Sequence, residues 1–281
     1  MTISPVLKRQ RRKVSFSVYL LLTVLGLFYL FPIIWVFLSS FKGYIELFEY
    51  PPKFLPKSFY PINYIESFVK GDWVRYFTNT FLVTAVSTLI CVVISEMGGY
   101  AFAKYNFKGR NFLFILFIST LMLPLEVLMI PIFIVIKKVG MYDSLWGLII
   151  PSAATPFGIF LIRQFYLSIP NEYIDSARID GAHEWQIFLR IMVPLGKSIM
   201  ACLAIFSALW RWNDYLWPLL VIRNDNNYTL QLALANFSGQ YNIQWQTIIA
   251  MMVLSMLPLL IIFLFFQKQI VDGMAMSGLK G

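Results

Sequence analysis

Six stretches of the chain consist almost entirely of apolar residues, and short polar segments separate them. The stretches lie at residues 17–38, 79–103, 112–136, 145–162, 198–222 and 245–266. The first contains no charged residue, and as a helix it is about 33 Å long, enough to cross a hydrocarbon core of about 30 Å. The pattern predicts an all-α polytopic membrane protein with six transmembrane helices.

The polar segments predict which side of the membrane each end of the chain occupies. A basic cluster near the N-terminus consists of Lys8, Arg9, Arg11, Arg12 and Lys13. Pooled with residues 1–16, segments 104–111, 163–197 and 267–281 hold 14 Lys and Arg in 74 residues. The alternating segments 39–78, 137–145 and 221–246 together hold 8 in 75. Because Lys and Arg gather on the cytoplasmic side, we expect both termini in the cytoplasm. The proline-rich segment 39–78 is then outside, with a short helix around Asn63–Val69.

One long polar segment, residues 170–194, interrupts the second half of the chain, and we call it the elbow. We expect two short helices that meet at Gly181, because glycine readily adopts the positive φ that a tight turn needs. Pro170 suits a first helical position, and Ser168 or Asn171 suits a cap. Helical spacing gives the two halves apolar faces at Ile174 and Ala177, and at Trp185, Phe188, Leu189 and Met192. The other positions are mostly charged, which suits contact with a soluble partner.

The elbow resembles the EAA loop of the membrane subunits of ABC importers. That pattern reads E-A-A, three residues, G, nine residues, I-x-L-P, and its spacing is kept by Asp175-Ser176-Ala177, Gly181 and Ile191-Met192-Val193-Pro194. Asp, Ser and Val replace the Glu, Ala and Leu of the pattern, which are conservative changes in size or charge. Residues 99–110, 121–131, 212–219 and the Lys280-Gly281 ending resemble the carbohydrate-uptake branch of the same family.

This resemblance implies a type I ABC importer permease fold. It implies the second membrane subunit of a binding-protein-dependent carbohydrate importer, of the maltose or glycerol-phosphate type, in the cell membrane. The implied partners are a sister permease in a heterodimer, two ATP-binding subunits and an extracytoplasmic solute-binding protein. ATP and magnesium would bind to the partner subunits, so no cofactor is expected in this chain.

The implied organisation has three parts. Residues 1–75 hold the cytoplasmic basic N-terminus, the first transmembrane helix and the outer loop. Residues 76–270 form a five-helix permease core with the cytoplasmic coupling loop at about 167–197. Residues 271–281 form a cytoplasmic tail.

The resemblance also assigns the elbow to a coupling role, in which a short helix seated on an ATPase passes its motion to the membrane helices. The assigned residues are Glu172, Asp175, Ser176, Ala177, Arg178, Asp180, Gly181, Ala182, His183, Ile191 and Pro194. Composition alone leaves a second interpretation open, an ordinary amphipathic helix at the membrane interface.

Composition excludes several classes of function. The chain has 281 residues, of which 59% are hydrophobic and 13% charged, and a net charge of +9; a soluble domain has about 25% charged residues. It holds one histidine, and no P-loop, dinucleotide-binding motif or nucleophile–base set appears. We therefore expect no enzyme activity, no metal site and no nucleic-acid partner. ATP hydrolysis, if it drives transport, belongs to another chain.

Two pairs of small residues within the apolar stretches are expected to serve packing. Cys91 and Cys202 are expected to be buried as small hydrophobic residues. Gly98 and Gly99, near the inner end of the second stretch, are expected to allow close helix contact.

Polar and aromatic residues in or beside the apolar stretches are candidates for the solute path, because charges at membrane depth must face protein or water. The candidates are Asn79, Glu126, Trp212, Asn213, Asp214 and Tyr215. An indole offers its face to the C–H side of a sugar, and amides and carboxylates bind its hydroxyls. Arg211 and Asp214, three residues apart, would share a helix face and could pair. Trp217 fits an interfacial aromatic belt at least as well as it fits sugar recognition. The role of Glu96 stays open.

A different mechanism is also compatible with the same fold. A stand-alone secondary transporter or channel would use Glu96, Glu126 and Asp214 as a proton or cation relay. It predicts transport driven by an ion gradient and no contact with an ATPase.

Overall fold

The computed structural model of the chain describes residues 16–238 and 244–278. Every regular element within these ranges is a helix. The basic cluster at residues 8–13 and the Lys280-Gly281 ending lie outside the described residues.

Within the residues that the structure describes, four helical segments are long and apolar enough to cross a membrane. Three of them are α1 (Phe16–Ser39), α4 (Trp73–Lys104) and α15 (Trp245–Gly278). The fourth, Leu145–Leu167, is built from α7 (Leu145–Ile149), η3 (Ile150–Ser152) and α8 (Pro156–Leu167). Two further pairs of helices pass the same test but are bent, and counting each pair as one span gives six. The predicted fold is thereby confirmed.

The first bent pair occupies the apolar stretch at 112–136, which was predicted as one transmembrane span. α5 (Arg110–Ser119) and η2 (Thr120–Met122) precede α6 (Leu125–Lys138), and the two parts meet at 109°. Pro124 causes the break, because proline lacks an N–H and disfavours helical backbone in the residue before it. Leu123 is accordingly extended, with ψ 128°.

The second bent pair joins the elbow to the membrane. α10 (Glu184–Ile187), the π-helix η4 (Phe188–Met192) and α11 (Val193–Leu195) meet α12 (Lys197–Trp212) at 72°. Gly196 lies at the bend.

The apolar stretch at 198–222 forms two helices, because α12 ends at Trp212 and α13 (Leu216–Val221) begins after a break. The prediction that Arg211 and Asp214 share one helix face is therefore wrong. Asp214 lies in the break, where its carboxylate accepts a hydrogen bond from the Trp217 amide at 3.4 Å. Short polar side chains compete in this way with helical hydrogen bonding.

The described residues divide into two compact units, residues 16–67 with 244–253, and residues 68–238 with 254–278. In the first unit, α2 (Tyr44–Leu47) and the start of α3 (Ile62–Lys70) follow α1. The Asn63 side chain donates to the carbonyls of Ser40 (2.9 Å) and Lys42 (3.0 Å), which holds the segment after α1 against α3. The short helix expected around residues 63–69 is confirmed.

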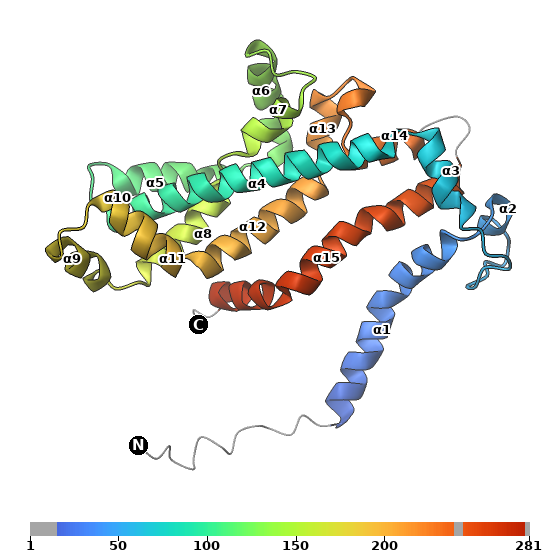
Figure 1. Ribbon diagram of the computed structural model, residues 1–281, viewed down its shortest axis with the longest axis horizontal. Helices are drawn as coiled ribbons and strands as arrows, with labels where there is room; N and C mark the ends of the chain where they lie inside the picture. Colours follow the sequence, from blue (N-terminus) through green and yellow to red (C-terminus); the bar gives the residue numbers. More distant parts are fainter. Residues whose placement is uncertain (1–15, 239–243, 279–281) are drawn as a thin grey trace. The chain divides into compact units, whose positions relative to one another are not determined.

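The second unit is assembled around α4, with α8 and α12 lying alongside it (Figure 1). A Cβ built on Gly99 would lie 2.6 Å from the Ile162 side chain, and one on Gly98 would lie 3.2 Å from Ile159. The expected close packing at this glycine pair is confirmed. Cys91 and Cys202 are buried free thiols, also as expected.

Trp217 corrects one expectation about the second unit. Its side chain is 8% exposed, and its indole N–H donates to the Gly147 carbonyl at 3.0 Å. It therefore belongs to a buried cluster with α6 and α7 residues rather than to an interfacial belt. The second unit also contains η5 (Asp225–Asn227) and α14 (Leu230–Ser238), which follow α13 in the sequence.

Candidate functional site

The elbow forms two short helices joined by a tight turn, as predicted. α9 (Glu172–Ile179) ends before Gly181, whose φ is +80°, and α10 begins at Glu184. The Gly181 amide donates to the Arg178 carbonyl (3.0 Å) and the Ala182 amide to the Ala177 carbonyl (2.9 Å). These two bonds make a Schellman motif, which satisfies carbonyls at the helix end and requires a left-handed residue.

The start of α9 differs from the prediction. The helix begins at Glu172, after Pro170, and the Asn171 side chain makes no capping hydrogen bond. Instead the Asn171 amide oxygen accepts from Lys104 Nζ at 2.8 Å, and Lys104 also donates to the Ile169 carbonyl at 2.5 Å. The Ser168 hydroxyl donates to the backbone carbonyl of Phe165. A lysine at the end of α4 thus anchors the entry to the elbow, a contact that local sequence cannot indicate.

The second half of the elbow carries only part of the expected apolar stripe. Phe188 and Met192 are buried, but Trp185 is 59% exposed and Leu189 53% exposed. The π-helix explains this difference, because its i→i+5 hydrogen bonds shift the register by one residue and turn Ile187 inward. The α10 start is fixed by the His183 amide, which donates to the Gln186 side chain at 3.0 Å.

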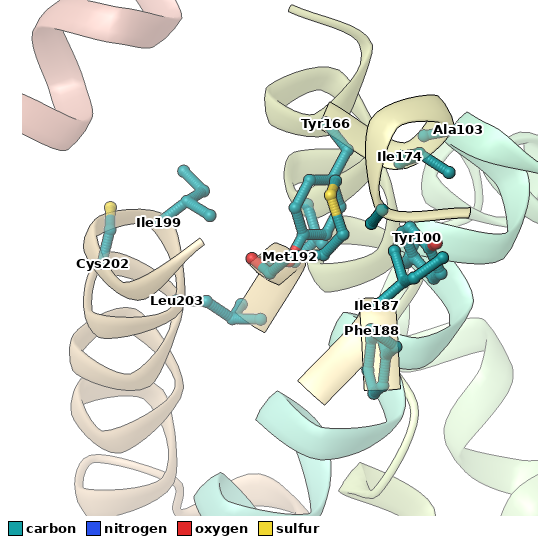
Figure 2. Close-up of a cluster of buried hydrophobic side chains, with 12 residues drawn as sticks. Tyr100, Ala103, Tyr166, Ile174, Ile187, Phe188, Met192, Ile199, Cys202 and Leu203 are labelled. Carbon is teal, nitrogen blue, oxygen red and sulfur yellow. Dashed lines mark hydrogen bonds between the residues drawn. The ribbon is translucent and has the colours of Figure 1, made fainter. Parts of the chain in front are cut away.

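The inner face of the elbow is packed into the helix bundle (Figure 2). Ile174 and Ala177 of α9 and Ile187 of α10 lie in one cluster with Tyr100 of α4 and Tyr166 of α8. Tyr166 and Ile187 are completely buried. We call this cluster the elbow core; it also contains Ile199, Cys202 and Leu203 of α12, so it joins the elbow to three membrane helices.

The charged side chains of the elbow are brought together across the turn. The Arg178 guanidinium donates to the carboxylates of Glu184 (Nε–Oε1, 2.7 Å) and Asp175 (Nη1–Oδ1, 3.4 Å). The Tyr105 hydroxyl donates to the other Glu184 oxygen at 2.8 Å. Burial, and then this hydrogen bond, raise the pKa of Tyr105. Exposed ion pairs contribute about 0–1 kcal/mol each, so the network chiefly fixes the angle between the helices.

The outer face of the elbow is exposed and partly apolar. Ile179 is 86% exposed and Tyr173 51% exposed, and Trp185 lies on the same elbow. We call these three residues the apolar contact set. The exposed positions among those assigned to coupling are Glu172, Asp175, Ser176, Arg178, Asp180, Gly181, His183 and Pro194, whereas Ala177 is buried and Ala182 and Ile191 are half-buried. Apolar patches rimmed by polar residues mark interaction sites, and these three residues are the candidates for such a contact on the elbow.

The six candidate path residues are not gathered in one place. Asn79 is buried, and its amide donates to the carbonyls of Asn226 (2.9 Å) and Tyr228 (3.0 Å). Glu126 is exposed in the first turn of α6. Trp212 is buried and donates to the Ser255 carbonyl at 3.0 Å. The remaining three follow it in the break before α13, namely Asn213, Asp214 and Tyr215.

Trp212 also lines an apolar cavity of about 850 Å³. Its walls come from α4, α12 and the middle of α15, and include Phe77, Thr88 and Pro258. The other five candidates are not among its lining residues.

Comparison with known proteins places the chain. Residues 95–276 match the family described as the binding-protein-dependent transport system inner membrane component. The arabinooligosaccharides transport system permease protein AraQ of Bacillus subtilis (strain 168) is 37% identical, over 96% of this chain and 99% of AraQ. The sn-glycerol-3-phosphate transport system permease protein UgpE of Pectobacterium atrosepticum is 32% identical, over 95% of this chain and 98% of UgpE.

The fold is also similar to that of solved structures. One chain of a bacterial ABC transporter involved in the import of the acidic polysaccharide alginate superposes with a TM-score of 0.82. It is 25% identical, and the match covers 95% of this chain and 99% of that one. The family match, the relatives and the fold agree, and this chain is a member of the family of inner membrane components of binding-protein-dependent transport systems.

Proposed function

We propose that this chain is the permease subunit that passes ATPase movement to a solute path for a sugar or sugar-like compound. Relatives named for transport of arabinooligosaccharides, sn-glycerol-3-phosphate and lactose support this solute class. The chain itself makes and breaks no bond of the solute.

The proposed assembly contains a sister permease, two ATP-binding subunits and an extracytoplasmic solute-binding protein. A solved alginate ABC transporter, related in fold, is in complex with a periplasmic protein bound to an alginate pentasaccharide. Both termini and the elbow lie in the cytoplasm in this proposal, because the segments on that side are the richer in Lys and Arg. The predicted part boundaries at residues 75 and 270 belong to the same proposal.

One observation carries the coupling role, namely the two-sided construction of the elbow. Its inner face is buried in the elbow core against α4 and α8, while the apolar contact set is exposed. A partner that grips the outer face therefore moves the inner face as well. ATP binding closes the partner subunits, the elbow follows, and the bend before α12 carries the movement into the membrane helices. Rigid-body movement of this kind is a common basis of switching.

The solute path is proposed to pass the break between α12 and α13. Asn213 and Tyr215 are exposed there, beside the half-buried Asp214. A helix break at membrane depth leaves backbone groups that need water or solute partners. Asn79, Glu126 and Trp212 complete the proposed set of path residues.

Copurification tests the assembly. The tagged chain is extracted from its native membrane in mild detergent, and bound ATP-binding subunits are quantified. Ile179→Asp places a charge in the apolar contact set and is expected to lose most of the bound ATPase. Ile45→Asp is the matched control, because Ile45 is 87% exposed and lies outside the elbow, in α2. Equal ATPase recovery with Ile179→Asp and Ile45→Asp would contradict the proposed contact.

A further inference from the structure

A buried carboxyl group lies directly beneath the elbow. Glu96 of α4 is 3% exposed, and one of its oxygens, Oε1, is hydrogen-bonded to the Tyr166 hydroxyl. The other oxygen, Oε2, has no hydrogen-bond partner among the described residues. Neither the coupling network nor the proposed solute path uses this group.

The Tyr166 hydroxyl connects this carboxyl to the elbow. Its oxygen lies 2.9 Å from the Met192 carbonyl oxygen, at the last residue of the π-helix. Figure 2 shows the Tyr166 ring beside Met192, within the elbow core. One phenol thus bridges α4, α8 and the segment that leads from the elbow into the bend.

The space around this bridge is closed by a glycine. A Cβ on Gly196 would lie 2.6 Å from the Tyr166 hydroxyl and 3.2 Å from Glu96 Oε1. The Gly196 amide in turn donates to the Met192 carbonyl at 2.8 Å. The residue at the 72° bend therefore packs directly against both polar groups.

The number of hydrogens available for these contacts indicates the protonation state of Glu96. A phenol has one hydrogen to donate, yet two acceptors flank Tyr166. If Glu96 is protonated, its O–H donates to Tyr166 and Tyr166 donates to Met192, so every contact holds a hydrogen. If Glu96 is ionised, Tyr166 donates its hydrogen to the carboxylate, and no hydrogen lies between the Tyr166 and Met192 oxygens. The charged Oε2 is then buried without a partner. Unpaired buried charges are strongly disfavoured.

We propose that Glu96, in its neutral form, is a positioning residue for coupling, which acts through Tyr166 to lock the end of the elbow onto α4 and α8. This proposal rests on the proposed function, because a lock is useful only if a partner pulls on the elbow. With the lock in place, elbow and α4 move as one body. Without it, the bend at Gly196 absorbs part of the movement.

The test measures that rigidity in the assembled complex. Spin labels are placed at Gln186 in α10 and Val93 in α4, in a background with Cys91 and Cys202 replaced by serine. The distance between the labels is measured without nucleotide and with ATP plus vanadate. We expect the same distance in both states for the wild type and for Glu96→Gln, which keeps a neutral polar group. Glu96→Leu and Tyr166→Phe should shift or broaden the distance when ATP and vanadate bind.

Two further variants keep the result interpretable. Ser87→Ala removes another buried hydroxyl of α4, which has no hydrogen-bond partner among the described residues, and should behave as the wild type. The double variant Glu96→Leu with Tyr166→Phe removes both partners of the hydrogen bond. Neither group is then left buried without a partner, so the fold is not destabilised by an unsatisfied polar group. This double variant should still shift or broaden the distance.

The outcomes separate the two proposals. Wild-type distances in Glu96→Leu, Tyr166→Phe and the double variant would overturn the lock. A Glu96→Gln variant that behaves like Glu96→Leu would overturn the neutral form. If no ATP-binding subunit copurifies with the wild type, the proposed function fails instead, independently of the distances.

Discussion

Arg178 and Glu184 bind each other across the turn at Gly181, with Arg178 Nε 2.7 Å from Glu184 Oε1. The hydrogen bond that Arg178 donates to the Glu184 carboxylate raises the pKa of the Arg178 guanidinium, which keeps the pair charged. Both side chains are nearly half-exposed. The pair therefore contributes little to overall stability and sets the angle between α9 and α10.

The first prediction concerns this pair. Arg178→Glu places like charges beside Glu184 and Asp175 and should open the angle of the elbow, lowering ATPase recovery in the copurification assay. Adding Glu184→Arg restores opposite charges across the turn and should recover most of the bound ATPase. The melting temperature of the detergent-solubilised chain should change little in either variant. Failure of the double variant to recover any ATPase would argue against an angular role.

The second prediction concerns the backbone at Gly181. A left-handed conformation costs a residue with a Cβ about 1–2 kcal/mol, and a β-branched side chain suits it worst. Gly181→Val should therefore insert normally but lose solute uptake. Gly181→Asn is the control, because asparagine tolerates positive φ, and no atom lies within 4 Å of a Cβ at this position. Normal uptake by Gly181→Val would show that the turn geometry is dispensable.

The third prediction concerns the segments outside the membrane helices. The Asp143 carboxylate accepts the backbone amides of Arg223 and Asn224, both at 2.9 Å. Burial raises the pKa of Asp143, but these hydrogen bonds outweigh it and the net effect lowers the pKa.

A lowered folded pKa means that the contribution of Asp143 is complete above the ordinary pKa of aspartate, about 3.9. It is lost as pH falls through the lower, folded pKa. Hydrogen exchange of the Arg223 and Asn224 amides should therefore be slow at pH 7, relative to the intrinsic rate, and lose protection in strong acid. Asp143→Ala should lose the protection at pH 7, and Asp143→Asn, which keeps an acceptor and tolerates the observed φ of 56°, should retain part of it. Equal protection in Asp143→Ala and wild type would exclude this anchoring.

The fourth prediction concerns the solute path. Asn213→Ala and Tyr215→Leu change exposed side chains in the break between α12 and α13. Uptake should fall, while bound ATPase and membrane insertion stay at wild-type levels. Asn106→Ala, in the segment between α4 and α5, is a control and should leave uptake unchanged. Unchanged uptake in both path variants would place the path elsewhere.

Local patterns in the sequence were sufficient to predict the six spans and the two short helices of the elbow. Long apolar stretches identify membrane helices, and the Gly181 turn follows from one glycine between two helical patterns. Spacing also placed Ile174 and Ala177 on the buried face of α9.

Contacts between distant residues could not be predicted in the same way. Lys104 reaches Asn171, and Tyr166 meets Glu96, across intervals of 67 and 70 residues, which depend on helix packing. The π-helix after Ile187 has no local marker, and so Trp185 and Leu189 were expected on the apolar face although both are exposed. Asp214 was assigned to a continuous helix, because the apolar pattern continues through the break that its side chain stabilises.

The central claim is that the elbow touches a separate ATP-binding subunit, and photo-crosslinking in intact cells tests it most directly. A photoreactive amino acid at Ile179 should give an adduct of this chain with the ATP-binding subunit, and the same residue at Ile45 should give none. Adducts from Ile179 with the solute-binding protein, or with lipid alone, would contradict the account.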